Sequence, residues 1–182
     1  MIAFSAARDH GHRIASAVIM NTVLPGLEPW QDILANPQIW HFALHQTPGL
    51  PETLVSGRER AYFDFFLDFL AGDKRKIDES LRQELVEAYL PPLALKNGFD
   101  WYRAMPRDAA RNAEPAVIDT PILYLRGDAD HRSIQPYLDG LAKAGAKRVT
   151  GKVIAGSGEI LSVEAPQALV GALREFAGSG QA

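Results

Sequence analysis

The chain has 182 residues, 47% hydrophobic and 23% charged, which is long enough for one domain with its own core. Its 19 basic and 22 acidic residues give a formal net charge of −3, which argues against nucleic-acid binding. The lack of cysteine excludes disulfides and thiolate nucleophiles, and no apolar run reaches the roughly 20 residues that cross a bilayer. The first residues do not resemble a secretory signal. We therefore expect a cytoplasmic protein without a nucleic-acid or membrane partner.

The two ends of the chain carry the pattern of a parallel α/β sheet. Residues 14–21 form a short, nearly unbroken apolar run, which is typical of a strand covered on both faces. Strands alternating with helices predict parallel pairing and right-handed crossovers. The predicted strands are 14–21, 120–127 and 148–154, and the helices beside them are 1–10, 133–144 and 163–176.

Between these ends, residues 22–116 contain only helices broken by proline and glycine. The helix over 56–69 is rich in aromatic rings on all sides, which predicts that it is buried between layers. We predict an α/β fold with three parallel strands, flanking helices and an inserted all-α cap. The core takes residues 1–21 and 117–182, and the cap takes 22–116. The cap helices are predicted at 29–34, 37–45, 56–69, 77–90 and 93–112.

Two loops that follow predicted strands carry residues capable of chemistry, and such loops hold the sites of α/β proteins. The first loop is Gly127-Asp128-Ala129-Asp130, and the second is Gly156-Ser157-Gly158-Glu159. Glu164-Ala165-Pro166 then opens the last helix. This order resembles the carboxyl-terminal part of an α/β-hydrolase.

The predicted cap narrows the resemblance. Trp40-His41-Phe42, Gln46-Thr47-Pro48-Gly49 and Asp100-Trp101-Tyr102-Arg103 are similar to cap motifs of the epoxide hydrolase and fluoroacetate dehalogenase branch. The resemblance runs through essentially the whole chain. It implies hydrolysis of an epoxide, a carbon–halogen bond or an ester in a small hydrophobic substrate, through a covalent ester intermediate. It implies no cofactor.

The resemblance also places individual site residues. Asp130 falls on the catalytic acid, Glu159 on the position of the water-activating base, and Tyr102 on a cap phenol that holds the leaving oxygen or halide. Tyr102 has the alternative interpretation of a packing residue, and His41 that of a buried cap histidine. His41 and His45 lie four residues apart with no glutamate between them, so no metal site is expected. The predicted substrate-binding residues are Trp40, His41, Phe42 and Trp101.

Two departures from the family bear on activity. Family members place a nucleophilic Asp on a sharp turn just before a helix like residues 2–6, so the nucleophile-bearing half is expected to precede Met1. Glu159 stands where the family carries a His, and a carboxylate is a weak base unless burial and Asp130 raise its pKa. Three accounts stay open: part of a hydrolase, a non-catalytic binding module, and a half that a second chain completes. The apolar strand at 14–21 would then offer an open edge for a homodimer or a complementing half.

Overall fold

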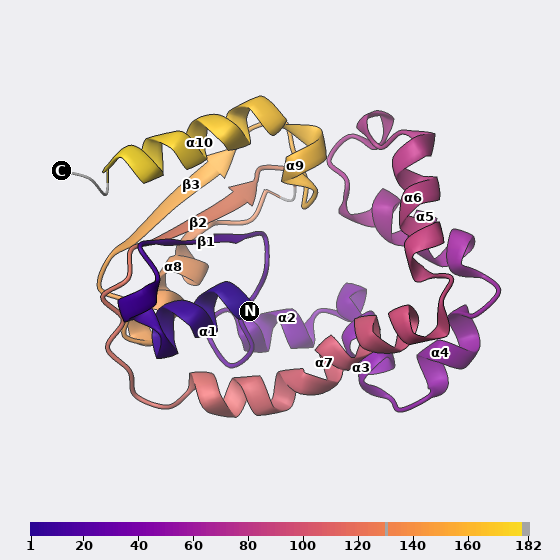
Figure 1. Cartoon of the computed structure of the whole chain (residues 1–182), viewed down its shortest axis with the longest axis horizontal. Coiled ribbons are helices and arrows are strands. Elements are labelled where there is room, and N and C mark those ends of the chain that lie inside the picture. The colour runs from indigo at the N-terminus through magenta and orange to yellow at the C-terminus, as the bar shows by residue number, and fades with distance from the viewer. Residues whose placement is uncertain (130, 180–182) are drawn as a thin grey trace.

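The strands from the two ends of the chain form one parallel sheet in the order β1-β2-β3 (Figure 1). The computed structural model describes residues 1–129 and 131–179. β1 (Ala17–Met20) pairs with β2 (Ile122–Gly127), and β2 pairs with β3 (Val149–Ile154). The fold class predicted from the sequence is confirmed, and β1 is shorter than the predicted strand at 14–21 because only Ala17–Met20 pairs with β2.

The central strand β2 is buried on both faces, as its continuous apolar sequence predicts. Ile122 and Tyr124 face a core that includes Phe4 of α1 (Ile2–Asp9) and Leu141 of α8 (Gln135–Lys143). The alternate residues of β2 face a second core under α9 (Leu161–Glu164) and α10 (Pro166–Ser179). Figure 1 shows α10 on one side of the sheet and α1 and α8 on the other. The sheet is therefore the middle of three layers.

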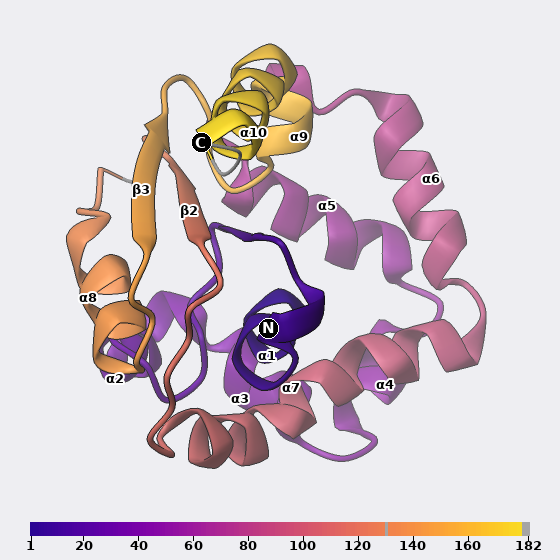
Figure 2. The ribbon, with the colours of Figure 1, turned by 60° about the vertical axis from the view of Figure 1, so that its left-hand side comes forward.

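The helices between β1 and β2, here called the cap, extend to one side of this sheet (Figures 1 and 2). Short 3-10 turns at Pro37–Ile39 and Lys74–Lys76 interrupt them. The sequence pattern does not predict α4, because Pro48-Gly49-Leu50-Pro51 has the composition of a turn. The α-helices are α2 (Trp30–Ala35), α3 (His41–Gln46), α4 (Leu50–Val55), α5 (Glu59–Leu70), α6 (Glu79–Tyr89) and α7 (Pro92–Asn112).

The predicted burial of the aromatic helix between layers is wrong. In α5, Phe65 is 48% exposed and Phe69 is 42% exposed, and their rings stack on each other with centroids 6.0 Å apart. One side of α5 packs on other cap helices, whereas the side that carries Phe65 and Phe69 stays partly exposed. Aromatic residues on all sides of a helix therefore did not mean that all sides are buried. The predicted last helix also divides into α9 and α10 at Ala165.

The outer edge of β1 pairs with no other strand in the part of the chain that the structure describes. Val18 and Met20 lie on β1, and Met20 is 45% exposed. A strand edge with free backbone groups is a place where another strand can pair.

Among the described residues, no helix is both long enough and apolar enough to cross a bilayer.

Candidate functional site

The carboxyl ends of the three strands meet around the side chain of Asn21. Its Oδ1 accepts the backbone N–H of Gly127 at 3.0 Å, which holds the loop after β2. Its Nδ2 donates to the carbonyl oxygen of Glu159 at 2.9 Å, which holds the loop after β3. Asn21 has a φ of 52°, a left-handed conformation that asparagine tolerates better than most residues. One amide, with both a donor and an acceptor, therefore ties three loops together.

Asp128 joins the loop after β2 directly to the loop after β3. Its Oδ1 accepts the backbone N–H of Gly156 at 2.8 Å. Ala129 also donates its backbone N–H to the carbonyl oxygen of Ser157 at 3.1 Å. Asp130, the predicted catalytic acid, lies outside the described residues, so its relation to Glu159 stays a prediction. The described residues on each side of Asp130 place this loop directly beside the one that carries Glu159.

These loops form one wall of a cavity of about 470 Å³, here called the main cavity, and cap helices form the opposite wall. Five of the sequence-predicted site residues line it: Glu159 from the sheet side, and His41, Phe42, Trp101 and Tyr102 from the cap. Arg126 and Arg132 also line it. The structure thus brings a carboxylate, a phenol, an imidazole and two guanidinium groups to a single space between the core and the cap.

Trp40 lies elsewhere. It is 46% exposed, and its ring packs against Phe65 and Phe66 with centroids 6.0 and 6.1 Å away. It is not among the described residues that line the main cavity. The predicted contact of Trp40 with substrate stays a prediction, while its neighbour His41 is buried and points to the cavity side of α3.

Tyr102 is held among aromatic rings of the cap. Its ring lies edge-on to those of His41, Phe42 and His45, with centroids 6.2, 5.4 and 4.3 Å away. Burial raises the pKa of the Tyr102 phenol, and the negative charge of Glu159 raises it further. The phenol therefore keeps its proton at neutral pH and is available as a hydrogen-bond donor.

His41 is a neutral group at pH 7. Its side chain is buried, and burial lowers its pKa from the usual value of about 6.5 to about 4. Its Nδ1 is buried without a hydrogen-bond partner among the described residues. The loss of water from this nitrogen is therefore not offset by a hydrogen bond within the described residues.

Arg126 is a site residue that the sequence analysis missed. It is 3% exposed, it is the fifth residue of the buried strand β2, and its guanidinium lies 4.6 Å from the centre of the Tyr137 ring. Tyr137 stacks in turn on Tyr124, whose hydroxyl donates to the carbonyl oxygen of Thr22 at 3.0 Å. The signal was present in the sequence: a charged residue at the end of an otherwise apolar strand points to function more often than to packing.

The last loop is fastened to the cap by the buried carboxylate of Glu164. Its Oε1 accepts the backbone N–H groups of Gly72 and Asp73 at 2.7 and 2.9 Å. Its Oε2 accepts that of Gly158 at 2.9 Å. Lys76 reinforces this junction, because its Nζ donates to two carbonyl oxygens of the core, those of Gly156 and Glu164. The position of Glu159 therefore depends on the cap segment that contains Gly72, Asp73 and Lys76.

No group of three or more side chains suited to hold a metal ion comes together within the described part of the chain. His41 and His45 lie on one helix with ring centroids 5.5 Å apart, but His45 is hydrogen-bonded to the hydroxyl of Tyr62. The described side chains that line the main cavity include neutral donors on the cap side, and a carboxylate and two guanidinium groups on the sheet side.

Comparison with known proteins agrees with this architecture. No family model and no curated protein sequence matches the chain. Among solved structures, Cfl2 from Burkholderia cenocepacia superposes with a TM-score of 0.78 and 29% identity, over 94% of this chain and 59% of its own. A candidate epoxide hydrolase from Pseudomonas aeruginosa gives 0.83 and 25%, over 99% and 62%. A candidate alpha/beta hydrolase from Nostoc sp. PCC 7120 gives 0.72 and 21%, over 92% and 59%.

The sheet, its flanking helices and these superpositions define an α/β-hydrolase fold. Within that fold, the chain is similar to the epoxide-hydrolase-like members, as its motifs indicate. The chain spans about 60% of the length of the solved structures it matches.

Proposed function

We propose that this chain forms the cap and the water-activating side of a hydrolase that opens an epoxide, or cleaves a carbon–halogen or ester bond, in a small hydrophobic substrate. The observation that carries the proposal is the main cavity, where Tyr102 and His41 on the cap face the loop of Glu159. A phenol and a neutral imidazole on one side and a carboxylate on the other suit a reaction that first develops and then removes negative charge on oxygen.

In the first step, a nucleophilic carboxylate attacks a carbon of the epoxide and the carbon–oxygen bond breaks. The oxygen takes a proton from the Tyr102 hydroxyl while His41 donates a second hydrogen bond to it. Both donors are neutral because the pKa of Tyr102 is raised and that of His41 is lowered. We assign no nucleophile to this chain; the part of the matched structures that it does not span would supply one.

In the second step, water attacks the ester carbonyl and gives one proton to Glu159. The ester carbon–oxygen bond then breaks, the diol oxygen takes the second proton of that water, and the nucleophilic carboxylate is restored. The proton on Glu159 returns to the Tyr102 phenolate that the first step left. The Glu159 carboxylate is placed for this role by two backbone contacts of its own residue, one to Leu70 and one to Asn21. Arg126 and Arg132, which share the cavity with Glu159, balance its charge at the same wall.

The DNA upstream of the Met1 codon tests the first half of this proposal, since an in-frame Gly-x-Asp-x-Gly-Gly would supply the elbow. Hydrolysis of styrene oxide by the protein that includes it tests the second half. Tyr102→Phe should lower kcat/KM by about 100-fold because it removes an oxyanion donor. Tyr124→Phe, which removes a hydroxyl outside the main cavity, is the control. Equal rates for the two variants would refute the role of Tyr102.

A second function, binding without turnover, is favoured by one observation: the residue at the position of the family's histidine base is Glu159. A carboxylate is a far weaker base than imidazole at neutral pH. Calorimetric binding of phenylethanediol, together with no hydrolysis of styrene oxide and no gain with Glu159→His, would identify a binding module. A sharp gain with Glu159→His would instead show that only the base is missing.

We also propose that the outer edge of β1 pairs with a strand of an elbow-bearing segment or of a second copy. The support is the open edge itself and the exposed side chain of Met20 beside it. Sedimentation of the chain alone would reveal a dimer, and mixing with the segment would convert it to a one-to-one complex. A stable monomer that ignores the segment would contradict this pairing.

A further inference from the structure

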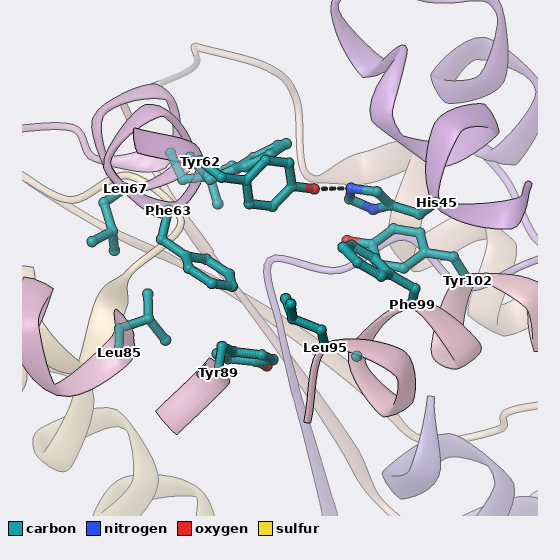
Figure 3. Close-up of a pocket in the computed structure, with 12 residues that line it drawn as sticks. His45, Tyr62, Phe63, Leu67, Leu85, Tyr89, Leu95, Phe99 and Tyr102 are labelled. Atoms are coloured by element: carbon teal, nitrogen blue, oxygen red, sulfur yellow. Dashed lines mark hydrogen bonds between the residues drawn. The ribbon is translucent and has the colours of Figure 1, made fainter. Parts of the chain in front are cut away.

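A second cavity of about 240 Å³ lies inside the cap, bounded by side chains of α3, α5, α6 and α7 (Figure 3). We call it the cap cavity. Figure 3 shows Phe63, Leu85, Tyr89 and Leu95 around its lower part, with the rings of Phe99 and Tyr102 on the other side. The cap cavity is partly open, and its volume is large enough to receive a small apolar group.

The wall of the cap cavity is neutral and almost entirely apolar. Two of its polar side chains, His45 and Tyr62, hydrogen-bond to each other (Figure 3). Burial lowers the pKa of His45 to about 4, with further contributions from His41 and Arg103, and burial raises the pKa of Tyr62. No residue lining this cavity in the described part of the chain is charged at pH 7. Such a wall excludes ions, whose desolvation it does not repay, and accepts hydrocarbon groups.

The cap cavity adjoins the main cavity. Five residues line both: Phe66, Leu70, Tyr89, Gly98 and Tyr102. Tyr102, the proposed oxygen-binding phenol, therefore presents one side to each space. Gly98 keeps this partition thin, because a Cβ atom there would lie 3.1 Å from the Tyr89 ring. A molecule held by Tyr102 in the main cavity would enter the cap cavity between these shared side chains.

The size of the cap cavity limits what it holds. An apolar cavity of about 150 Å³ is known to bind benzene, so one of about 240 Å³ has room for a benzene ring with a short alkyl extension. We propose that the cap cavity is the subsite for the phenyl or short alkyl group of the substrate, while its reacting end lies beside Tyr102 and His41. That the bound group belongs to a substrate rests on the proposed function. The class of ligand, a small apolar group, does not depend on it.

Toluene is a suitable probe because it has only an apolar body. NMR of the protein with toluene should give nuclear Overhauser effects from the toluene methyl group to Leu85 and Leu95. Leu85→Trp, which fills the cap cavity from α6, should weaken toluene binding by about tenfold or more. Leu93→Trp adds the same bulk at a leucine that is 68% exposed, so it should leave binding within about twofold.

The outcomes separate this inference from the proposed function. Overhauser effects only to Met105 or Trp101 of the main cavity, or no toluene binding at all, would overturn the subsite even if the enzyme hydrolyses epoxides. Contacts to Leu85 and Leu95 support it even if no epoxide is hydrolysed, and they need no variant to fold. In an active enzyme, Leu85→Trp should reduce the preference for styrene oxide over propylene oxide by about tenfold, and Leu93→Trp should keep it. An unchanged preference in Leu85→Trp would overturn the subsite.

Discussion

The backbone N–H of Glu159 donates to the carbonyl oxygen of Leu70 at 2.8 Å. This bond joins the last loop of the sheet to the final residue of α5, so the proposed base and the cap share a common support. The buried carboxylate of Glu164 adds backbone bonds to Gly72, Asp73 and Gly158. The cap and the loop of Glu159 are therefore joined by several hydrogen bonds at one junction, and changes at this junction should affect both.

Replacing Glu164 by glutamine should destabilise the protein by about 2–4 kcal/mol. The carboxylate accepts several backbone N–H groups from a buried position, whereas one end of a glutamine amide can only donate, which leaves buried N–H groups without an acceptor. Urea unfolding at pH 7 measures the difference. The control is Glu175→Gln, which removes an exposed carboxylate paired with Lys152 and should change the stability much less, because water screens this pair. Equal effects of the two variants would contradict the junction.

Two glycine-to-alanine changes should have opposite effects on the stability of the protein. A Cβ at Gly158 would lie 2.3 Å from both the nitrogen of Gly72 and the carbonyl oxygen of Leu70, so Gly158→Ala must displace the junction and lower Tm. A Cβ at Gly171, in α10, meets nothing within 4 Å, so Gly171→Ala should stabilise the helix by about 0.5–1 kcal/mol. Calorimetry of both variants checks the pair. A Gly158→Ala protein as stable as the wild type would show that the loop and the cap are not in contact.

The buried histidines should make the protein sensitive to mild acid. In the folded state His41 and His45 have a pKa of about 4, lowered chiefly by burial, against about 6.5 in an unfolded chain. Between these values the unfolded state binds more protons, so stability is full above pH 6.5 and falls as the pH drops toward 4. The loss should reach up to about 3 kcal/mol for each histidine.

Urea unfolding from pH 7 to 4 measures this loss. His45→Gln should make the free energy of unfolding depend less on pH between 7 and 4, because one of the two titrating histidines is gone. His12, which is exposed, offers the comparison: His12→Gln should leave the slope unchanged. If all three proteins show the same slope, the acid sensitivity comes from other groups and the burial of His45 does not control it.

The parallel sheet could be predicted because residues 122–125 of β2 form an unbroken run without charge and the strand is covered on both faces. The same logic failed for α5, since aromatic rings such as Phe65 and Phe69 can stack on each other at the surface instead of being buried. α4 escaped prediction because Pro51 at its start also fits a turn. Local sequence shows which residues are apolar, but the packing of distant helices decides which of them are covered.

The main cavity could be predicted only in part. Tyr102, His41 and Glu159 were found through motifs that resemble a known family, and the structure brings all three to one space. Asn21 was not found, because its role depends on bonds to loops far away in the sequence. Arg126 was missed although a charged residue near the end of an apolar strand was visible in the sequence. Asn21 binds Gly127 and Glu159, which lie more than one hundred residues further along the chain. No local pattern encodes such a meeting.

The most direct test of the account is a titration of the Tyr102 phenol, followed by NMR of ring-labelled tyrosine. The account holds that Glu159 and Tyr102 face each other across one cavity, and that the carboxylate helps to raise the pKa of the phenol. Glu159→Gln should therefore lower the pKa of Tyr102, while Glu175→Gln leaves it unchanged. A Tyr102 pKa that is the same in the wild type and in Glu159→Gln would contradict the shared site.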